Sequence, residues 1–508
     1  MRVAVAASSQ LAADAGAEIA RAGGNAVDVA IAAALVSANT EPGVCALAGG
    51  GYVTLHQPGA AALSIDGQVR MPGAGLAPES LGRGLETVDM AYGGGVTTRV
   101  DAGAVGVPAT LAALDAAWRH AGRLPWAVLF EPAIACTRKG FPLPGACHHY
   151  LGYSRDVVFG RSTDGHAALH DAQGQLRDAG EPIVVPGLAD SLERIARLGA
   201  DDFYRGELAR AISAHVLERD GMLTLEDLAN CRATVSDALA VDVGDWRIAT
   251  TPPPAIGGAV LAAMLHAAGW PLPAGAGAAD VARVARVMHL ALDFRRTRLD
   301  TSDTPETECV ELMSRARRFA LALQSPSTVH VSATDSDGLA CAITLSAGYG
   351  SGLMPPGTGL WLNNCLGELE LNHRGPIIGP PGTPVPSNMA PTVAVRDDES
   401  EVIAIGSPGA DRITSALFQV LLHHLGGGLG LAEAIAHPRL HLEHRNGGWQ
   451  VACEPGIDAD ALEWPVRRFD GPSMFFGGVG ATRLHSAGQL EAAADPRRAG
   501  GLAVDGEL

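Results

Sequence analysis

The stretch from Ser327 to Gly338 constrains the fold of this chain more than any other segment. Apolar and polar residues alternate from Thr328 to Thr334, which is the two-residue period of a half-buried β-strand. One face of the strand is therefore expected to lie in the core and the other to carry hydroxyl groups. The run that ends at Gly338 predicts a hairpin with this glycine in the left-handed conformation, which pairs Asp335 with Leu339.

The same hairpin register sets Ser346 directly opposite Thr328, and such cross-strand partners lie about 4.5–5.5 Å apart. A threonine hydroxyl is a poor nucleophile without a base. A chain terminus at Thr328 would supply that base as its own α-amino group, with a pKa of about 7.7–8.0. The segment also fits a β-branched strand residue with no chemical role, so the residues alone leave both interpretations open.

Ordered motifs extend over nearly the whole chain. They include Gly23-Gly24-Asn25-Ala26-Val27-Asp28 and Glu41-Pro42-Gly43 near the amino terminus, and Gly406-Ser407-Pro408-Gly409 and Asp495-Pro496-Arg497-Arg498 after Thr328. In their order these motifs resemble the gamma-glutamyltransferase family of N-terminal-nucleophile hydrolases. The resemblance implies an α/β (α+β) fold, the four-layer αββα sandwich, with Thr328 at the start of a central strand.

The resemblance also implies a proenzyme that cuts itself between Ser327 and Thr328. Attack of the Thr328 hydroxyl on the Ser327 carbonyl would give an ester, and water would open this ester and release the threonine amine. Pro326 and its small polar neighbours favour an extended, accessible cleavage segment. The expected products are a large segment, 1–327, and a small segment, 328–508. They would form one composite domain and stay together as a heterodimer, which could oligomerise further.

The family resemblance also implies, from positions within the motifs, which residues bind the substrate and which take part in catalysis. Arg70 matches the family arginine that clamps the substrate α-carboxylate, a role that suits a planar, bidentate donor. Ser387 and Asn388 match two small hydroxyl residues on the same carboxylate, and asparagine can still donate a hydrogen bond. Gly409 and Ala410 match paired glycines whose backbone N–H groups form the oxyanion hole. The methyl group of Ala410 bears on the width of the pocket.

The residues expected to contact the substrate ammonium depart from the family pattern. The connection after Ser346 is shorter and lacks an asparagine, Cys365 stands at a glutamine position, and Glu368 stands at an aspartate position, with Glu370 a second candidate. A thiol is a weak hydrogen-bonding group. We therefore expect ammonium recognition to be weakened and carboxylate recognition to be kept. The acyl group would be γ-glutamyl, or one with a terminal carboxylate and no obligatory amine, such as an oxamate-like or dicarboxylic acyl group.

The segment 371–386 is short compared with family members that carry a lid over the site. A more open pocket is expected, which favours hydrolysis or an unusual acyl acceptor over tightly gated transfer.

The composition limits the partners of this protein. The net charge of -18 argues against nucleic acid and anionic membrane surfaces, so the expected partner is a small-molecule amide substrate. Lys139 is the only lysine, which excludes a phosphate-binding G-x-x-x-x-G-K loop. No secretory signal pattern is visible at the amino terminus, and the early apolar run 29–36 is too short to cross a membrane. We expect a cytoplasmic protein.

Other catalytic classes fit the sequence poorly. The eight cysteines form no C-x-x-C pair, and the adjacent histidines of His148-His149 and His423-His424 would diverge on a helix or strand. A metal site is therefore poorly supported, and the family resemblance implies that no metal or organic cofactor is needed. A serine hydrolase with His330 as base would need a G-x-S-x-G elbow, which is absent. A non-enzymatic binding homologue stays open, and the presence or absence of two fragments on a denaturing gel separates it from a processed enzyme.

Overall fold

The structure is a computed structural model of the 508-residue chain. It describes residues 2–91, 95–269, 278–300, 302, 304–316, 328–445, 447–460 and 462–504. Ser327, on the amino-terminal side of the expected cleavage site, lies outside these residues.

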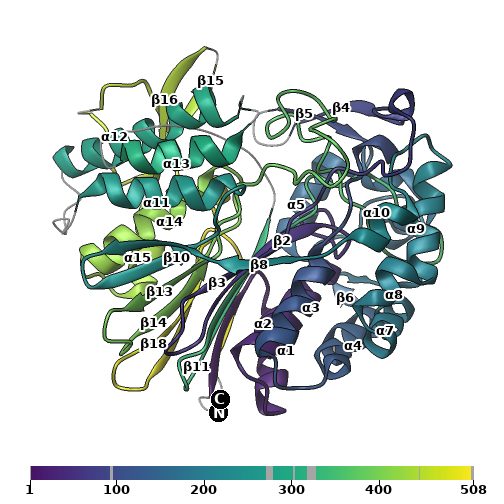
Figure 1. The fold of residues 1–508 in the computed structure, drawn as a ribbon, viewed down its shortest axis with the longest axis horizontal. Helices are drawn as coiled ribbons and strands as arrows, with labels where there is room; N and C mark the ends of the chain where they lie inside the picture. The colour runs from purple at the N-terminus through teal and green to yellow at the C-terminus, as the bar shows by residue number, and fades with distance from the viewer. Residues whose placement is uncertain are drawn as a thin grey trace.

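Two antiparallel sheets face each other at the centre of the molecule (Figure 1). Within the described residues, the first has seven strands in the spatial order β20 (Gly501–Val504), β1 (Val3–Ala7), β11 (Val329–Asp335), β12 (Ala340–Ser346), β2 (Gly50–His56), β3 (Leu63–Gly67) and β8 (Thr234–Asp237). The second has six, in the order β19 (Leu490–Ala494), β18 (Gly480–Leu484), β14 (Val402–Gly406), β13 (Thr392–Arg396), β10 (Trp246–Thr250) and β9 (Leu239–Val243).

Helices cover the outer face of each sheet. The first sheet is covered by α1 (Gln10–Arg21), α2 (Ala26–Thr40) and α3 (Thr110–Ala121), and the second by α11 (Ile256–Ala268) and α14 (Arg412–Leu421). Helices α12 (Ala278–Phe294) and α13 (Pro305–Ala316) pack against α11. This arrangement is the four-layer αββα sandwich, and the fold expected from the sequence is confirmed.

The remaining elements lie around this sandwich. A group of helices extends the first helical layer, on the right in Figure 1: α4 (Glu131–Lys139), α5 (Gly145–Ser154), α6 (Thr163–Leu169), α7 (Leu188–Leu198), α8 (Ala200–Arg205), α9 (Glu207–Leu217) and α10 (Leu225–Asn230). Small sheets and one short helix complete the described chain: β4 (Glu86–Met90) with β5 (Val96–Val100), β6 (Phe141–Pro142) with β7 (Pro182–Ile183), β15 (Leu440–Arg445) with β16 (Gly448–Cys453) and β17 (Val466–Arg468), and α15 (Leu431–Ala436).

The segments before and after Thr328 interleave in both sheets. In the first sheet, β11 and β12 from the later segment lie between β1 and β2 from the earlier one. In the second sheet, β13 from the later segment pairs with β10 from the earlier one. Neither segment could complete either sheet without the other.

Hydrogen bonds at its first turn fix the start of helix α2. Asn25 and Asp28 form a capping box at the start of α2, in which each side chain accepts a hydrogen bond from the backbone of the other residue. The Asp335 carboxylate, at the end of β11, accepts a hydrogen bond from the Ala26 N–H at 3.1 Å. The start of α2 is thereby fixed to the end of the central strand.

The predicted hairpin register is confirmed in the described strands. Val329 pairs with Leu345 and Thr334 with Ala340 along β11 and β12, and the Asp335 N–H donates to the Leu339 carbonyl at 3.0 Å. Gly338 has a φ of 90°, the left-handed conformation that the turn requires. Extended by one residue, this register places Thr328 opposite Ser346 at the mouth of the hairpin.

The expectation that β11 is half-buried is wrong, because all of its residues are buried. Val329 and Val331 pack in the hydrophobic cluster that includes α2, as predicted. The hydroxyl face does not meet water, because the second sheet covers it. Thr334 Oγ1 lies 2.8 Å from Thr482 Oγ1, and the Ser332 hydroxyl donates to the Gly480 carbonyl at 3.2 Å. The polar face of this strand is an interface between the two sheets.

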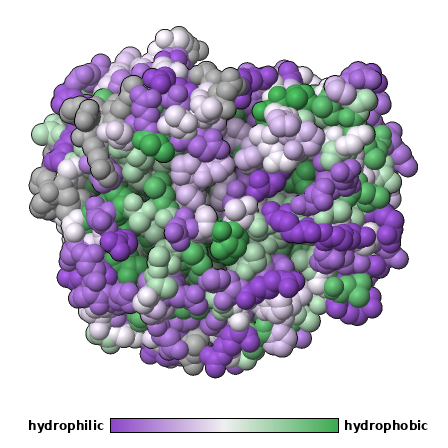
Figure 2. All heavy atoms as spheres, in the orientation of Figure 1, coloured by the Kyte–Doolittle hydropathy of each residue, from purple (hydrophilic) through white to green (hydrophobic). Residues whose placement is uncertain are grey.

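The surface is mostly hydrophilic on the face shown in Figure 2, where hydrophobic residues gather only in small patches. Within the described residues, no helix is long and apolar enough to cross a membrane. The two ends of the described chain lie close together, since β1 and β20 are neighbouring strands (Figure 1).

Candidate active site

One pocket brings together most of the residues singled out in the sequence. It contains about 320 Å³ of space, part of it open to solvent. The predicted residues that line it are Thr328, Ser346, Cys365, Glu368, Ser387 and Asn388. The other lining residues are Gln68, Leu371, Met389 and Ile413. Residues separated by as many as 345 positions in the sequence thus meet at the amino-terminal end of β11.

Thr328 is 1% exposed and lines this acyl pocket, the name used below for the cavity that contains Thr328 and Ser346. It also lines a second pocket, of about 660 Å³, bordered by Ser8, Glu41 and Arg498. The Ser8 hydroxyl donates to Glu41 Oε1 at 2.5 Å, and burial raises the pKa of Glu41 to about 7. The second pocket therefore holds a carboxyl group that can change its protonation near neutral pH.

Ser346 lies at the end of β12, where the chain turns away from the sheet. Its Oγ accepts a hydrogen bond from the Gly348 N–H at 3.1 Å. The bond fixes the Ser346 side chain at the pocket wall, on the strand that pairs with the one beginning after Thr328.

Gly409 and Ala410 form a turn between β14 and α14. Their φ angles are 129° and 66°, so Ala410 has the left-handed conformation that glycine adopts more easily. Pro408 borders the second pocket and Ile413 lines the acyl pocket, and Thr328 lines both. The turn therefore passes beside Thr328, at the amino-terminal end of a ten-residue helix whose dipole favours negative charge there. This position suits N–H groups that stabilise an oxyanion.

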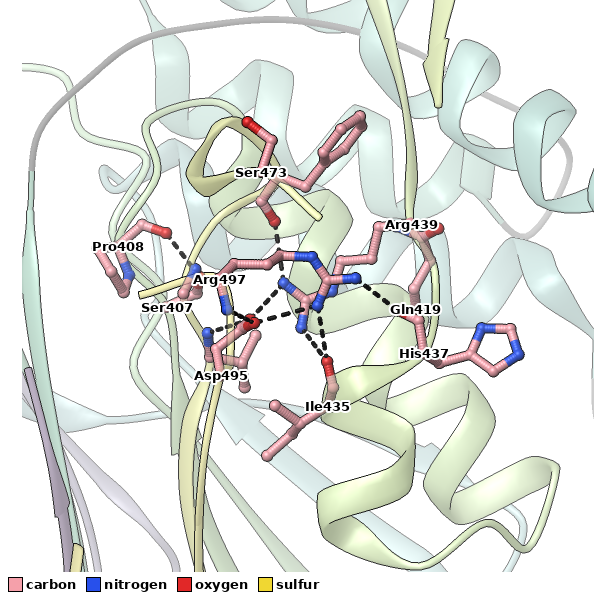
Figure 3. A network of polar contacts seen from close by, with 12 residues as sticks. Ser407, Pro408, Gln419, Ile435, His437, Arg439, Ser473, Asp495 and Arg497 are labelled. Carbon is pink, nitrogen blue, oxygen red and sulfur yellow. Dashed lines mark hydrogen bonds and ion pairs between the residues drawn. The ribbon is translucent and has the colours of Figure 1, made fainter. Parts of the chain in front are cut away.

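A buried network of charged side chains supports this turn (Figure 3). Arg439 and Arg497, both 1% exposed at the side chain, form ion pairs with the two oxygens of Asp495 at 2.6 and 3.1 Å. Asp495 also accepts the Val479 N–H at 2.9 Å. The neighbouring Gly478 N–H donates to Ser407 Oγ at 3.1 Å. The carboxy-terminal Asp-Pro-Arg-Arg motif thus holds the chain beside the 407–410 turn.

A second polar chain lies behind the turn. Ser415 Oγ is 2.9 Å from His441 Nδ1, and His441 Nε2 is 3.1 Å from Asp411 Oδ2. The order of groups is that of a serine-histidine-aspartate triad, but each side chain is buried and Ser415 lies within helix α14. Burial would raise the pKa of Asp411, but Arg412 and His441 hold it well below its ordinary value. These hydrogen bonds anchor Asp411, the residue that follows Ala410.

His330 is also poorly suited to act as a base. Burial lowers its pKa to about 3, so the ring is neutral at ordinary pH. Its ring nitrogens lie 2.9 Å from Thr344 Oγ1 and 2.7 Å from Ser332 Oγ. The neutral ring thus links hydroxyl groups of β11 and β12, two neighbouring strands of the first sheet.

The predicted ammonium side of the pocket contains two neighbouring acidic groups. Burial, together with the charge of Glu370, raises the pKa of Glu368 well above its ordinary value. The Cys365 thiol is hydrogen-bonded to Glu368, and burial raises the pKa of this thiol well above its ordinary value as well. Glu370 Oε1 accepts a hydrogen bond from the Tyr349 hydroxyl at 3.0 Å. Burial therefore favours the protonated form of Glu368, which can donate a hydrogen bond as well as accept one.

The predicted carboxylate side is built from Ser387 and Asn388. Tyr52, on β2, is hydrogen-bonded to Ser387. Nη1 of the buried Arg295 donates to Asn388 Oδ1. Both residues that were assigned to carboxylate binding are thus held from behind by residues that the sequence did not single out.

Arg70 does not line the acyl pocket, although Gln68, two residues earlier, does. Arg70 Nη2 lies 3.5 Å from Asp66 Oδ2, and its side chain is 19% exposed. The backbone beside it pairs with the 371–386 segment, since the Met71 N–H donates to the Thr383 carbonyl at 2.8 Å. The carboxylate-clamp role of Arg70 stays a prediction.

The 371–386 segment also borders a third pocket, of about 880 Å³, with Leu371 in common with the acyl pocket. Its walls are rich in proline, with Pro254, Pro305, Pro384 and Pro386, and they also include charged residues such as Asp300 and Arg374. The 371–386 segment, which is short compared with family members that carry a lid, thus also bounds space beside the acyl pocket.

Some signals for the missed residues were present in the sequence. Gln68 is two residues from Arg70 in an extended segment, so both side chains were candidates for the same side. Arg295 continues the buried face of α12 that includes Met288 and Ala291, at helical spacing. A charged residue on such a face requires a buried partner. Among the described residues, no group of three or more histidine, cysteine or acidic side chains could hold a metal ion.

Comparisons with known proteins agree with this arrangement. Residues 12–504 match the family model described as gamma-glutamyltranspeptidase. The chain is 30% identical to a glutathione hydrolase proenzyme of Pseudomonas aeruginosa over 549 residues, which covers 99% of this chain and 94% of that protein. It is 27% identical to the glutathione hydrolase proenzyme of Escherichia coli, over 95% of this chain and 88% of that protein.

A solved structure is similar over almost the full length. The crystal structure of cephalosporin acylase from Bacillus halodurans superimposes with a TM-score of 0.77 at 25% identity, over 99% of this chain and 95% of that one.

Proposed function

Because the chain belongs to the gamma-glutamyltranspeptidase family of enzymes, we propose that it is a self-processing amidohydrolase or acyltransferase with Thr328 as the nucleophile. Its substrate is a small-molecule amide whose acyl group is γ-glutamyl or a related group that carries a carboxylate. The observation that carries this proposal is the shared pocket of Thr328, Ser346, Ser387 and Asn388. Thr328 at the start of the strand, Ser346 opposite it, and the two residues predicted to bind the carboxylate all border one cavity.

The first step of the reaction is acyl transfer to Thr328. Its α-amino group, exposed by cleavage, takes the proton from the Thr328 hydroxyl as the oxygen attacks the amide carbon. The N–H groups of Gly409 and Ala410 stabilise the oxyanion. The carbon–nitrogen bond then breaks, the amine leaves with the proton, and an ester on Thr328 remains. Water or an acceptor amine opens this ester and regenerates the hydroxyl.

Self-processing uses the same hydroxyl on the peptide bond before Thr328. The ester that forms joins residue 327 to the Thr328 oxygen, and its hydrolysis frees the α-amino group that later serves as base. The products are residues 1–327 and 328–508, held together as a heterodimer. The interleaved strands of both sheets support this association, since each segment completes sheets begun by the other.

The names of the relatives suggest two classes of acyl donor. Glutathione, the substrate named for the curated relatives, is a γ-glutamyl amide, and the structural relative is named for cephalosporins. A donor with a terminal carboxylate but no amine is favoured by the weak hydrogen-bonding thiol of Cys365 and by the burial that raises the pKa of Glu368. A buried neutral acid must release a proton before it can pair with an ammonium group, and this requirement weakens amine selection.

Intact mass spectrometry of the purified protein tests the proposal. Wild-type protein should give two masses that correspond to 1–327 and 328–508. Thr328→Ala should give one uncut chain with no amidase activity, and Thr328→Ser should retain part of both processing and activity. Thr234→Ala, an exposed threonine on edge strand β8 of the same sheet, is the matched control and should process as the wild type does. A cleaved Thr328→Ala chain would refute the assignment.

A further inference from the structure

Arg295 is an arginine buried behind the wall of the acyl pocket. It follows α12, and its side chain is 2% exposed. Nε lies 2.9 Å from Asp300 Oδ1, and Asp300 is 6% exposed. A buried guanidinium requires such a counter-charge. The ion pair therefore keeps Arg295 charged and fixed in place.

The same guanidinium reaches the pocket wall, because Nη1 donates to Asn388 Oδ1. A guanidinium has donors only, whereas an asparagine amide has an oxygen that accepts and a nitrogen that donates. The orientation of an amide follows from its hydrogen bonds. With its oxygen on Arg295, Asn388 has its NH₂ group on the opposite side of the amide. Asn388 lines the acyl pocket.

Arg295 also acts electrostatically on Asp411, next to the turn of Gly409 and Ala410. Burial alone would raise the pKa of Asp411. The charges of Arg412 and His441 lower this pKa, and the charge of Arg295 makes a smaller contribution in the same direction. Asp411 follows Ala410 in the turn beside Thr328. One buried cation thus lies close to both the carboxylate wall and the oxyanion turn.

We propose that Arg295 is a positioning residue that makes Asn388 a hydrogen-bond donor toward the bound acyl group. The carboxylate side of the pocket then offers two hydrogen-bond donors, the Asn388 NH₂ and the Ser387 hydroxyl. Together they suit a carboxylate better than an ammonium group. This inference rests on the proposed function, and it names the group in that site that decides which end of the acyl chain is recognised.

Glutarate and butyrate are suitable probes, since they differ by one terminal carboxylate. Their dissociation constants can be measured by isothermal titration calorimetry on the processed protein. Asn388→Asp keeps the shape of the side chain and its bond to Arg295, but it replaces the donor with a second acceptor. We expect glutarate to bind about 10- to 100-fold more weakly to Asn388→Asp, with little change for butyrate. Asn388→Ser, which retains a donor, should lose less than about fivefold.

The positioning role is tested in a double-mutant cycle. Arg295→Lys keeps the charge next to Asp300 but loses the fixed geometry of the guanidinium. In the native background it should weaken glutarate binding about three- to tenfold. In the Asn388→Ser background it should add almost nothing, because a serine hydroxyl rotates freely and needs no arginine to orient it.

Equal weakening by Arg295→Lys in both backgrounds would overturn the proposal, because it would mean a general effect on charge or folding. Unchanged glutarate binding by Asn388→Asp would also overturn the proposal. Because Asn388→Asp leaves the Arg295–Asp300 pair in place, it still tests the proposal in case Arg295→Lys does not fold. Wild-type protein that binds no carboxylic acid would refute it as well. Wild-type protein that binds glutarate but cleaves no amide would refute the proposed function and leave the role of Arg295 intact.

Discussion

Nη1 of Arg439 lies 2.6 Å from Oδ2 of Asp495 in the interior, where each side chain is 1% exposed. The Arg439 guanidinium also donates to the Phe476 carbonyl at 3.0 Å, and Asp495 accepts the Val479 N–H. The pair therefore fixes the segment 476–479, which contacts the turn at Ser407 through the Gly478 N–H. Removal of Asp495 would take away the carboxylate that pairs with both buried arginines, so the geometry of the 407–410 turn depends on ion pairs distant from it in sequence.

Ala410→Gly should stabilise the protein and keep its activity. The φ of Ala410 is 66°, and a residue with a Cβ loses about 1–2 kcal/mol in the left-handed region. The greater freedom of glycine in the unfolded chain offsets about 0.5–1 kcal/mol of that gain. A net gain of up to about 1.5 kcal/mol is expected in urea unfolding of the uncleaved Thr328→Ala chain. Gly409→Ala is the opposite control, because its Cβ would lie 2.8 Å from Gly477 Cα and the φ is 129°.

Arg70→Ala should weaken substrates that carry a carboxylate far more than their neutral analogues, by roughly 2–5 kcal/mol if Arg70 closes on the acyl group as a clamp. Glutaryl and valeryl anilides provide the comparison, with kcat/KM as the measured quantity. Arg70→Lys keeps the charge without the bidentate geometry and should fall between Ala and the wild type. Processing should continue in both variants. An equal loss on the two anilides would show that Arg70 acts by some route other than carboxylate binding.

The altered ammonium side predicts weak selection for an amine. A γ-glutamyl anilide and its des-amino glutaryl counterpart should have similar specificity constants, or the glutaryl compound should be preferred. A site built to bind the amine would instead reject the analogue without it by about 10⁴-fold or more. Cys365→Gln places an amide next to Glu368 and should shift the preference toward the γ-glutamyl compound. Strong γ-glutamyl preference in the wild type would mean that Glu368 or Glu370 binds the ammonium after all.

Glu41 predicts a pH dependence of stability. Burial raises its pKa from 4.5 to about 7, so the folded state favours the neutral acid. Below pH 4.5 both states hold the proton and the contribution is complete. Between pH 4.5 and 7 the unfolded chain loses the proton first, so the free energy of unfolding falls by up to about 1.4 kcal/mol per pH unit.

Glu41→Gln should remove this slope, because the amide does not titrate. The measurement is urea unfolding of the Thr328→Ala chain, with and without Glu41→Gln, between pH 4.5 and 8. If the difference in unfolding free energy between the two chains stayed constant across this pH range, the assigned protonation of Glu41 would be wrong.

Sequence patterns that act within a few residues predicted the local structure around the site. The alternation of β11 and the turn at Gly338 each depend on neighbours in the chain, and both are present as expected. The resemblance added the order of motifs, and with it the fold. Six of the residues that it assigned to the site line one pocket.

The tertiary structure decided which groups those local elements face. The hydroxyl face of β11 looked like a surface in sequence, but the second sheet covers it, and no pattern within one strand identifies the layer that packs on it. The orientation of Asn388 depends on Arg295, which lies 93 residues away. The left-handed conformation of Ala410 depends on the turn that its surroundings hold. Periodicity, caps and turns are encoded locally, whereas burial partners and the direction of an amide arise only when distant segments pack together.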